Sequence, residues 1–132
     1  MTKTELNTII TTIKTLREVI DDKTASTITE CFSSMKYNGK TIVKNTRINF
    51  EGLLYQAKED IIDLENNNPI NNIALWNTPK YKNGYRIISA IILSEEAFAK
   101  GECGWWKDVL YESIIDNNTW NPEEYSIGWK IL

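Results

Sequence analysis

Histidine is absent from this 132-residue chain. Without it, the side chain that most often acts as a general base near neutral pH is missing. Neither a Ser-His-Asp triad nor a Cys-His pair can be built from this chain alone. Zinc sites made of cysteine and histidine are also excluded, because two cysteines would need carboxylates to complete four ligands. We therefore predict a protein that is not an enzyme and that uses no metal or cofactor.

Cysteine is scarce, with one residue at position 31 and one at position 103. Two cysteines do not make a disulfide framework. They would pair in an oxidising compartment, but in a cytosol we expect both to be reduced. Cys103 lies just before a predicted helix, where a thiol has a lowered pKa and gains reactivity. A small thiol- or carboxylate-dependent enzyme centred on Cys103 is therefore an alternative to the non-enzymatic reading.

Long hydrophobic runs are missing as well. No stretch of about 18 apolar residues is present, so the sequence predicts no transmembrane helix. The N-terminal residues have no basic region followed by an apolar block, which argues against a secretory signal and favours a cytoplasmic protein. No repeat at a fixed period and no long linker is visible, so we predict one globular domain over residues 1–132.

Apolar residues recur at steps of three and four through most of the chain, which predicts a mainly α-helical fold. The clearest helix covers residues 4–20, and Thr2 with Glu5 fits a capping box at its start. We expect five or six helices packed around one core. The other predicted helices cover residues 24–37, 50–64, 69–76, 85–100 and 104–116.

Residues 85–93 also fit a strand, because they are β-branched and follow an Asn-Gly pair that suits a hairpin turn. The C-terminal residues 125–131 alternate apolar and polar side chains, which is typical of a strand. An α+β alternative would pair residues 42–50, 85–93 and 125–131 in a small sheet.

The formal net charge is only −3, but it is unevenly spread. Residues 94–124 hold eight acidic residues against two lysines, and four of the five tryptophans lie beyond position 100. An acidic surface argues against a nucleic-acid ligand and suits a basic protein partner. Tryptophan and tyrosine dominate the binding energy of protein interfaces. The candidate partner-binding residues are Glu95, Glu96, Glu102, Trp105, Asp108, Glu112, Asp116, Trp120, Glu123 and Glu124, with Glu59, Asp60 and Asp63 as a second acidic patch.

In size, charge and lack of a catalytic constellation, the chain is similar to the immunity proteins of bacterial contact-dependent inhibition and polymorphic toxin systems. This resemblance implies binding to a cognate toxin domain, often a basic nuclease, at its active site or substrate surface. From the charge and the lack of a long apolar run, we predict no nucleic-acid partner and no membrane partner. A phage or plasmid accessory protein that inhibits a host protein uses the same physics and is an alternative.

Overall fold

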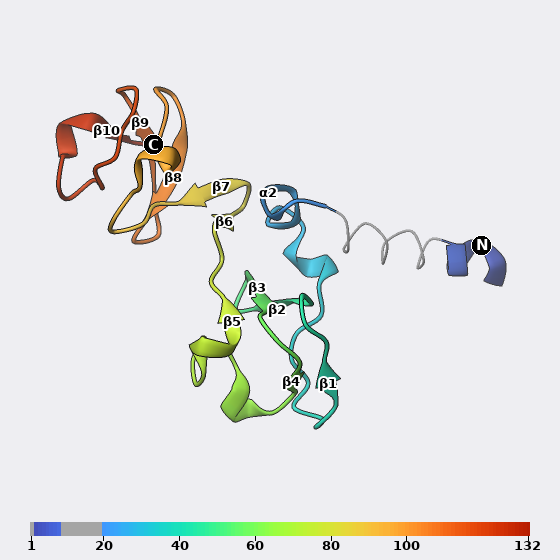
Figure 1. The fold of residues 1–132 in the computed structure, drawn as a ribbon. Helices are drawn as coiled ribbons and strands as arrows, with labels where there is room; N and C mark the ends of the chain where they lie inside the picture. The colour runs from blue at the N-terminus through green and yellow to red at the C-terminus, as the bar shows by residue number, and fades with distance from the viewer. Residues whose placement is uncertain (1, 9–19) are drawn as a thin grey trace. The chain divides into compact units, whose positions relative to one another are not determined.

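The computed structural model describes residues 2–8 and 20–132 (Figure 1). It divides into two compact units, Met1–Pro79 and Lys80–Leu132, each with its own hydrophobic core. Within the described residues the fold is mainly β, with ten strands in three sheets. The predicted bundle of five or six helices is therefore wrong. The prediction of one globular domain over residues 1–132 stays a prediction.

The first unit begins with a helical segment at residues 3–8. The hydroxyl oxygen of Thr2 accepts a hydrogen bond from the backbone N–H of Glu5 at 3.1 Å, which confirms the predicted start of this helix. Residues 9–19 of the predicted first helix lie outside the described residues. The predicted helix over residues 24–37 is wrong. Two short turns of helix, α2 (Asp22–Ala25) and η1 (Thr29–Cys31), occupy this region instead, and the chain after them is irregular.

Two antiparallel sheets follow in the first unit. The larger contains β2 (Arg47–Phe50), β3 (Leu53–Ala57) and β5 (Trp76–Asn77) in the order β2-β3-β5. The smaller pairs β1 (Thr41–Ile42) with β4 (Ile61–Ile62). The helices predicted over residues 50–64 and 69–76 are therefore wrong. The second of them contains one turn of 3-10 helix, η3 (Ile73–Leu75), and another, η2 (Glu65–Asn67), lies between the two predicted ranges.

The second unit holds one five-stranded sheet in the order β10-β9-β8-β7-β6. All neighbours are antiparallel except β7 and β8, which run parallel. Two turns of 3-10 helix, η4 (Ser94–Glu96) and η5 (Ser126–Gly128), complete this unit. The strands are β6 (Tyr81–Lys82), β7 (Tyr85–Ile87), β8 (Cys103–Trp106), β9 (Val109–Ser113) and β10 (Trp129–Ile131).

The helices predicted over residues 85–100 and 104–116 are thus wrong. The strand alternative for residues 85–93 is right for its first three residues, and the C-terminal alternation does end in a strand. The small sheet proposed for residues 42–50, 85–93 and 125–131 does not form as such. β2 belongs to a sheet of the first unit, whereas β7 and β10 share the sheet of the second.

Tight turns explain why these short segments pair as strands. Three hairpins have two-residue turns in which both residues have positive φ, the geometry that matches the twist of paired strands. The turn residues are Glu51 and Gly52, Asn83 and Gly84, and Lys107 and Asp108.

The two units contain the same structural frame. In each, a hairpin (β2–β3 or β8–β9) is followed by a third strand that begins with a buried tryptophan. Trp76 pairs with Ala57 at the end of β3, and Trp129 pairs with Ser113 at the end of β9. A turn of 3-10 helix, η3 or η5, precedes the tryptophan in each case.

The polar contacts of the frame repeat too. The indole N–H of Trp76 donates to the carbonyl of Asn67 at 2.9 Å, and that of Trp129 donates to the carbonyl of Trp120 at 2.8 Å. The next residue is a buried asparagine in both units, Asn68 or Asn121, followed by proline. Each asparagine side-chain oxygen accepts two backbone N–H groups of the following turn. The chain thus holds two copies of one frame, although no fixed-period repeat was expected.

Candidate binding surface of the second unit

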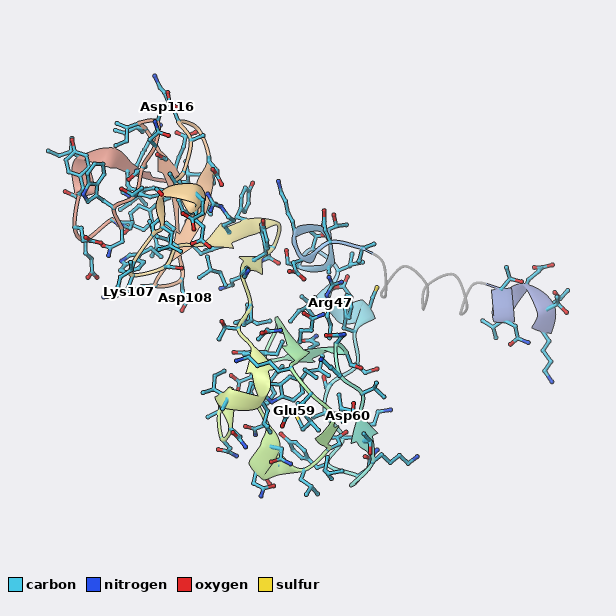
Figure 2. The ribbon with its side chains drawn as sticks, in the orientation of Figure 1. Arg47, Glu59, Asp60, Lys107, Asp108 and Asp116 are labelled. Atoms are coloured by element: carbon cyan, nitrogen blue, oxygen red, sulfur yellow. The ribbon has the colours of Figure 1, made fainter. Side chains whose placement is uncertain are left out.

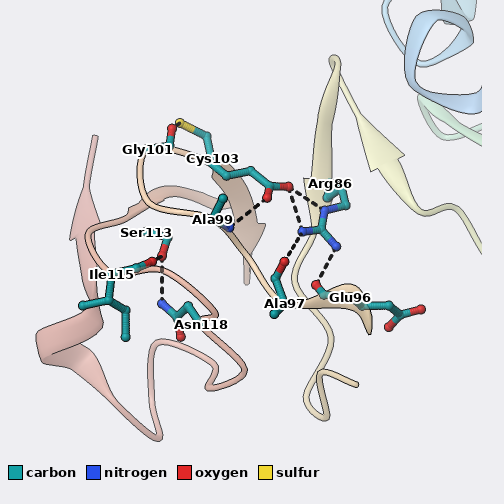
Figure 3. Close-up of polar contacts among 10 residues, drawn as sticks. Arg86, Glu96, Ala97, Ala99, Gly101, Cys103, Ser113, Ile115 and Asn118 are labelled. Atoms are coloured by element: carbon teal, nitrogen blue, oxygen red, sulfur yellow. Dashed lines mark hydrogen bonds and ion pairs between the residues drawn. The ribbon is translucent and has the colours of Figure 1, made fainter. Parts of the chain in front are cut away.

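Several predicted partner-binding acids are instead bound within their own unit. Glu102 forms an ion pair with Arg86, with the carboxylate Oε2 at 2.7 Å from Nε, and its Oε1 accepts the backbone N–H of Ala99 at 3.1 Å (Figure 3). The Arg86 guanidinium also donates to the carbonyl of Glu96 at 2.8 Å and lies 3.8 Å from the centroid of the Phe98 ring. Glu102 and Arg86 therefore hold the loop around η4 against the sheet.

Three other acids fix backbone turns. Asp60 accepts the backbone N–H of Lys44 at 2.8 Å, and Asp116 accepts that of Lys100 at 3.1 Å, so this bond also repeats between the two frames. Figure 2 labels both acids, Asp60 in the first unit and Asp116 in the second. Asp63 is buried and accepts two backbone N–H groups at 3.0 and 3.1 Å. A carboxylate that accepts backbone N–H groups stabilises the local turn, which is a sufficient role for these residues.

The end of the β8–β9 hairpin carries two ion pairs. Lys82 contacts Asp108 at 3.2 Å and lies over the Trp105 ring, whose indole N–H donates to the Lys82 carbonyl at 2.7 Å. Lys107 contacts Glu123, and the hydrogen bond from Lys107 lowers the pKa of this carboxyl below its ordinary value. Lys107, Asp108 and Glu123 are exposed and Lys82 is half-buried. Ion pairs at such surface positions contribute little to stability.

The remaining predicted acids are Glu59, Glu95, Glu96, Glu112 and Glu124. Glu59, Glu95, Glu96 and Glu124 are exposed, and Glu112 is half-buried in β9. Glu95 accepts a long bond from the neighbouring Ser94 hydroxyl at 3.3 Å. Glu124 accepts a hydrogen bond from the Asn121 side chain at 2.6 Å, and Glu59 belongs to the first unit.

A pair of exposed aromatic side chains lies between β9 and β10. Trp120 is 45% exposed and Tyr125 is 38% exposed, yet their ring centroids are 5.3 Å apart with an interplanar angle of 59°. The backbone at each ring is fixed, because Trp120 N–H donates to the Asn118 side chain and Tyr125 N–H donates to the Asn121 carbonyl. Sequence reasoning named Trp120 but missed Tyr125 as its partner.

The first unit has the same frame without this pair. Asn67 occupies the position of Trp120, because both carbonyls accept the indole N–H of the frame. The backbone bond from Gly128 N–H to the Tyr125 carbonyl corresponds to the bond from Leu75 N–H to the Asn72 carbonyl. Three positions therefore differ together between the two frames: Trp120, Tyr125 and Gly128 stand where the first unit has Asn67, Asn72 and Leu75. The corresponding bonds of the first unit thus form without an aromatic pair at these positions.

Cys103 begins β8, so the predicted position at a helix start is wrong. Burial raises the pKa of the Cys103 thiol, and the carboxylates of Glu112 and Glu102 raise it further. Its sulfur lies 3.9 Å from the Gly101 carbonyl, to which the thiol donates (Figure 3). A raised pKa means less thiolate at neutral pH, which is the opposite of what a nucleophile needs.

Alkylation of Cys103 is therefore expected to be slower at pH 7 in the folded protein than in the same protein unfolded in urea. A Cys31→Ser variant leaves Cys103 as the one reactive thiol, and mass spectrometry follows iodoacetamide addition over time. Glutathione under both solvent conditions gives the reference rate. A folded-state rate equal to or above the unfolded rate would revive the thiol-enzyme alternative.

Among the described residues, no cluster of three or more metal-ligating side chains is present, and no helix is long and apolar enough to cross a membrane. Comparison with protein-family models gives no match, and comparison with curated proteins gives none either.

Proposed function

We propose that this protein is a non-enzymatic binding protein whose second unit holds a saccharide against Trp120 and Tyr125. One observation carries the proposal: two copies of the same frame exist, and the exposed aromatic pair belongs to one of them. Contiguous exposed apolar surface marks binding sites, whereas single exposed apolar residues are ordinary, and Trp120 and Tyr125 are exposed side by side. This argues for a binding role of the pair itself.

The chemistry of the pair favours a sugar ring. An aromatic face carries partial negative charge, and it attracts the partly positive C–H bonds that a pyranose presents on its faces. The centroids of the two rings are already 5.3 Å apart, so the rings are packed together before binding and lose little rotamer freedom. Glu123 and Glu124 lie between the two aromatic residues in the sequence, and their carboxylates are bound to Lys107 and Asn121.

A partner protein is the second candidate, because exposed tryptophan and tyrosine also dominate protein interfaces. A basic toxin domain remains one such partner, and the exposed acids Asp108 and Glu123 of the second unit would face it. Nothing in the fold or the comparisons supports the narrower role in contact-dependent inhibition. That role is not carried further.

The test is binding of the purified chain to a panel of insoluble and soluble polysaccharides, including cellulose, chitin, β-glucans and peptidoglycan. Trp120→Ala is expected to weaken binding about tenfold or more, equal to roughly 1.4 kcal/mol, because it removes half of the contact surface. Asn67→Ala is the matched control at the corresponding position of the first unit, and it should bind as the unaltered chain does.

Two results would reject the proposal in different ways. If no polysaccharide binds the unaltered chain, the ligand class is wrong. If binding is found but survives Trp120→Ala, the site is wrong. Binding to a basic protein that weakens with added salt and is lost in Trp120→Ala would instead support the second candidate.

A further inference from the structure

We infer that Gly128 is the positioning residue of this site and that, of the two described frames, the one in the second unit carries the site. The inference rests on the proposed function for its ligand. The geometric part, which concerns where the Tyr125 ring lies, is measurable without any ligand.

Gly128 is held firmly in the frame. It is buried at the end of η5, its N–H donates to the Tyr125 carbonyl at 3.1 Å, and its carbonyl accepts bonds from Ile114 N–H at 3.0 Å and from the Asn118 side chain at 3.1 Å. These bonds fix the backbone against which the Tyr125 ring lies.

A side chain at this position would collide with the ring. A Cβ atom built on Gly128 would lie 2.9 Å from Cδ2 and 3.2 Å from Cε2 of Tyr125, and 3.3 Å from the Asn118 side-chain nitrogen. Carbon atoms do not approach to 2.9 Å without displacement, and the ring is the part that is free to move outward. Gly128 does not have the positive φ that would demand glycine for backbone reasons. The close approach of Tyr125 is thus the reason for glycine here.

The first unit supplies the comparison. Leu75 stands at the same place in its frame, packs against the core of that unit, and has Asn72 in place of the tyrosine. A large side chain is therefore compatible with the frame once no ring lies over the backbone. A side chain at position 128 should displace Tyr125 from Trp120 and leave the strands intact.

The test compares Gly128→Ala, Tyr125→Ala and the double variant. Gly128→Ala is expected to weaken saccharide binding about tenfold or more, as far as Tyr125→Ala does. The double variant should bind no more weakly than Tyr125→Ala alone, because Gly128 acts through the ring; a merely structural role would add to the loss. Calorimetry should give one bound ligand per chain.

A ligand-free measurement separates the two proposals. In nuclear magnetic resonance spectra, contacts between the Tyr125 and Trp120 rings should be seen in the unaltered chain and lost in Gly128→Ala, whose backbone amide spectrum stays folded. Ring contacts that persist, an unfolded spectrum in Gly128→Ala, a fully additive double variant or two ligands per chain would each overturn this inference. Failure of the unaltered chain to bind any saccharide, with the ring contacts changing as expected, would overturn the proposed function alone.

Discussion

Replacing Trp129 by alanine is expected to destabilise the second unit by about 3–5 kcal/mol, the usual cost of removing a buried tryptophan. The side chain is 6% exposed and lies edge-on to Phe98, with ring centroids 5.1 Å apart. Its indole N–H closes the loop between β9 and β10 through the Trp120 carbonyl. The variant therefore loses core volume and the bond that holds the aromatic pair. Urea denaturation followed by amide signals of the second unit measures the change.

Trp120→Ala is the matched control, since it removes a tryptophan side chain from an exposed position in the loop before β10. It should change the free energy of unfolding by less than about 0.5 kcal/mol. The loss of its contact with the Tyr125 ring adds a small amount to this change. Trp129→Phe should fall between the two, because it keeps most of the apolar surface and loses the indole bond. Equal effects of Trp129→Ala and Trp120→Ala would contradict the assignment of core and surface.

The helical prediction failed for a geometric reason. Phe50 and Leu53 are three residues apart, as on one face of a helix, but they are directly opposite each other across a two-residue turn. In the second unit, Trp106 and Val109 are also three residues apart and directly opposite each other across a two-residue turn. A two-residue hairpin turn places cross-strand neighbours at a spacing of three, so short hairpins imitate helical periodicity. The turn residues predict these strands better than the apolar spacing does. The Asn83-Gly84 pair, for example, indicated the hairpin turn that the structure contains.

The internal repeat was missed because its period changes along the chain. Ala57 and Ser113 are 56 residues apart, whereas Trp76 and Trp129 are 53 apart, so the segment between hairpin and tryptophan differs in length. Few residues are identical at matching positions, and those that are serve the frame. The Asn-Pro pair that begins at Asn68 in one unit and at Asn121 in the other was one visible signal, and the Leu-Tyr pair of each hairpin, at Leu54 and Leu110, was another.

The candidate site was predicted in part. An exposed Trp120 in a polar loop could be anticipated from the sequence, because polar loops leave aromatic side chains in water. The use of Asp116 and Glu102 within the unit could not, since an excess of acids along the sequence does not show which carboxylates accept backbone N–H groups. Tyr125 and Gly128 gain meaning only beside their counterparts in the first unit.

The isosteric change Asn118→Asp is expected to destabilise the second unit by roughly 4 kcal/mol at pH 7, equivalent to a pKa raised by about three units at 1.36 kcal/mol each. Asn118 is 0% exposed, and its side-chain N–H groups donate to the Ser113 hydroxyl and the Gly128 carbonyl. The Ser113 hydroxyl donates to the Ile115 carbonyl, so its proton is already used (Figure 3). A carboxylate at position 118 would face two acceptor oxygens without a proton between them.

The pH dependence follows from the direction of that shift. Burial raises the folded-state pKa of the introduced carboxyl above its unfolded value of about 3.9, so the folded state binds the proton more tightly. The penalty is therefore small below pH 4, grows as pH rises above the unfolded pKa, and levels off above the folded pKa. Urea denaturation at pH 4 and pH 7, each against the unaltered chain, measures this penalty.

Asn117→Asp is the matched control, because it adds the same charge at the exposed neighbouring residue and should change stability by less than about 0.5 kcal/mol. A penalty that is equal at both pH values, or equal in both variants, would show that Asn118 contributes no buried hydrogen-bond donor to the frame.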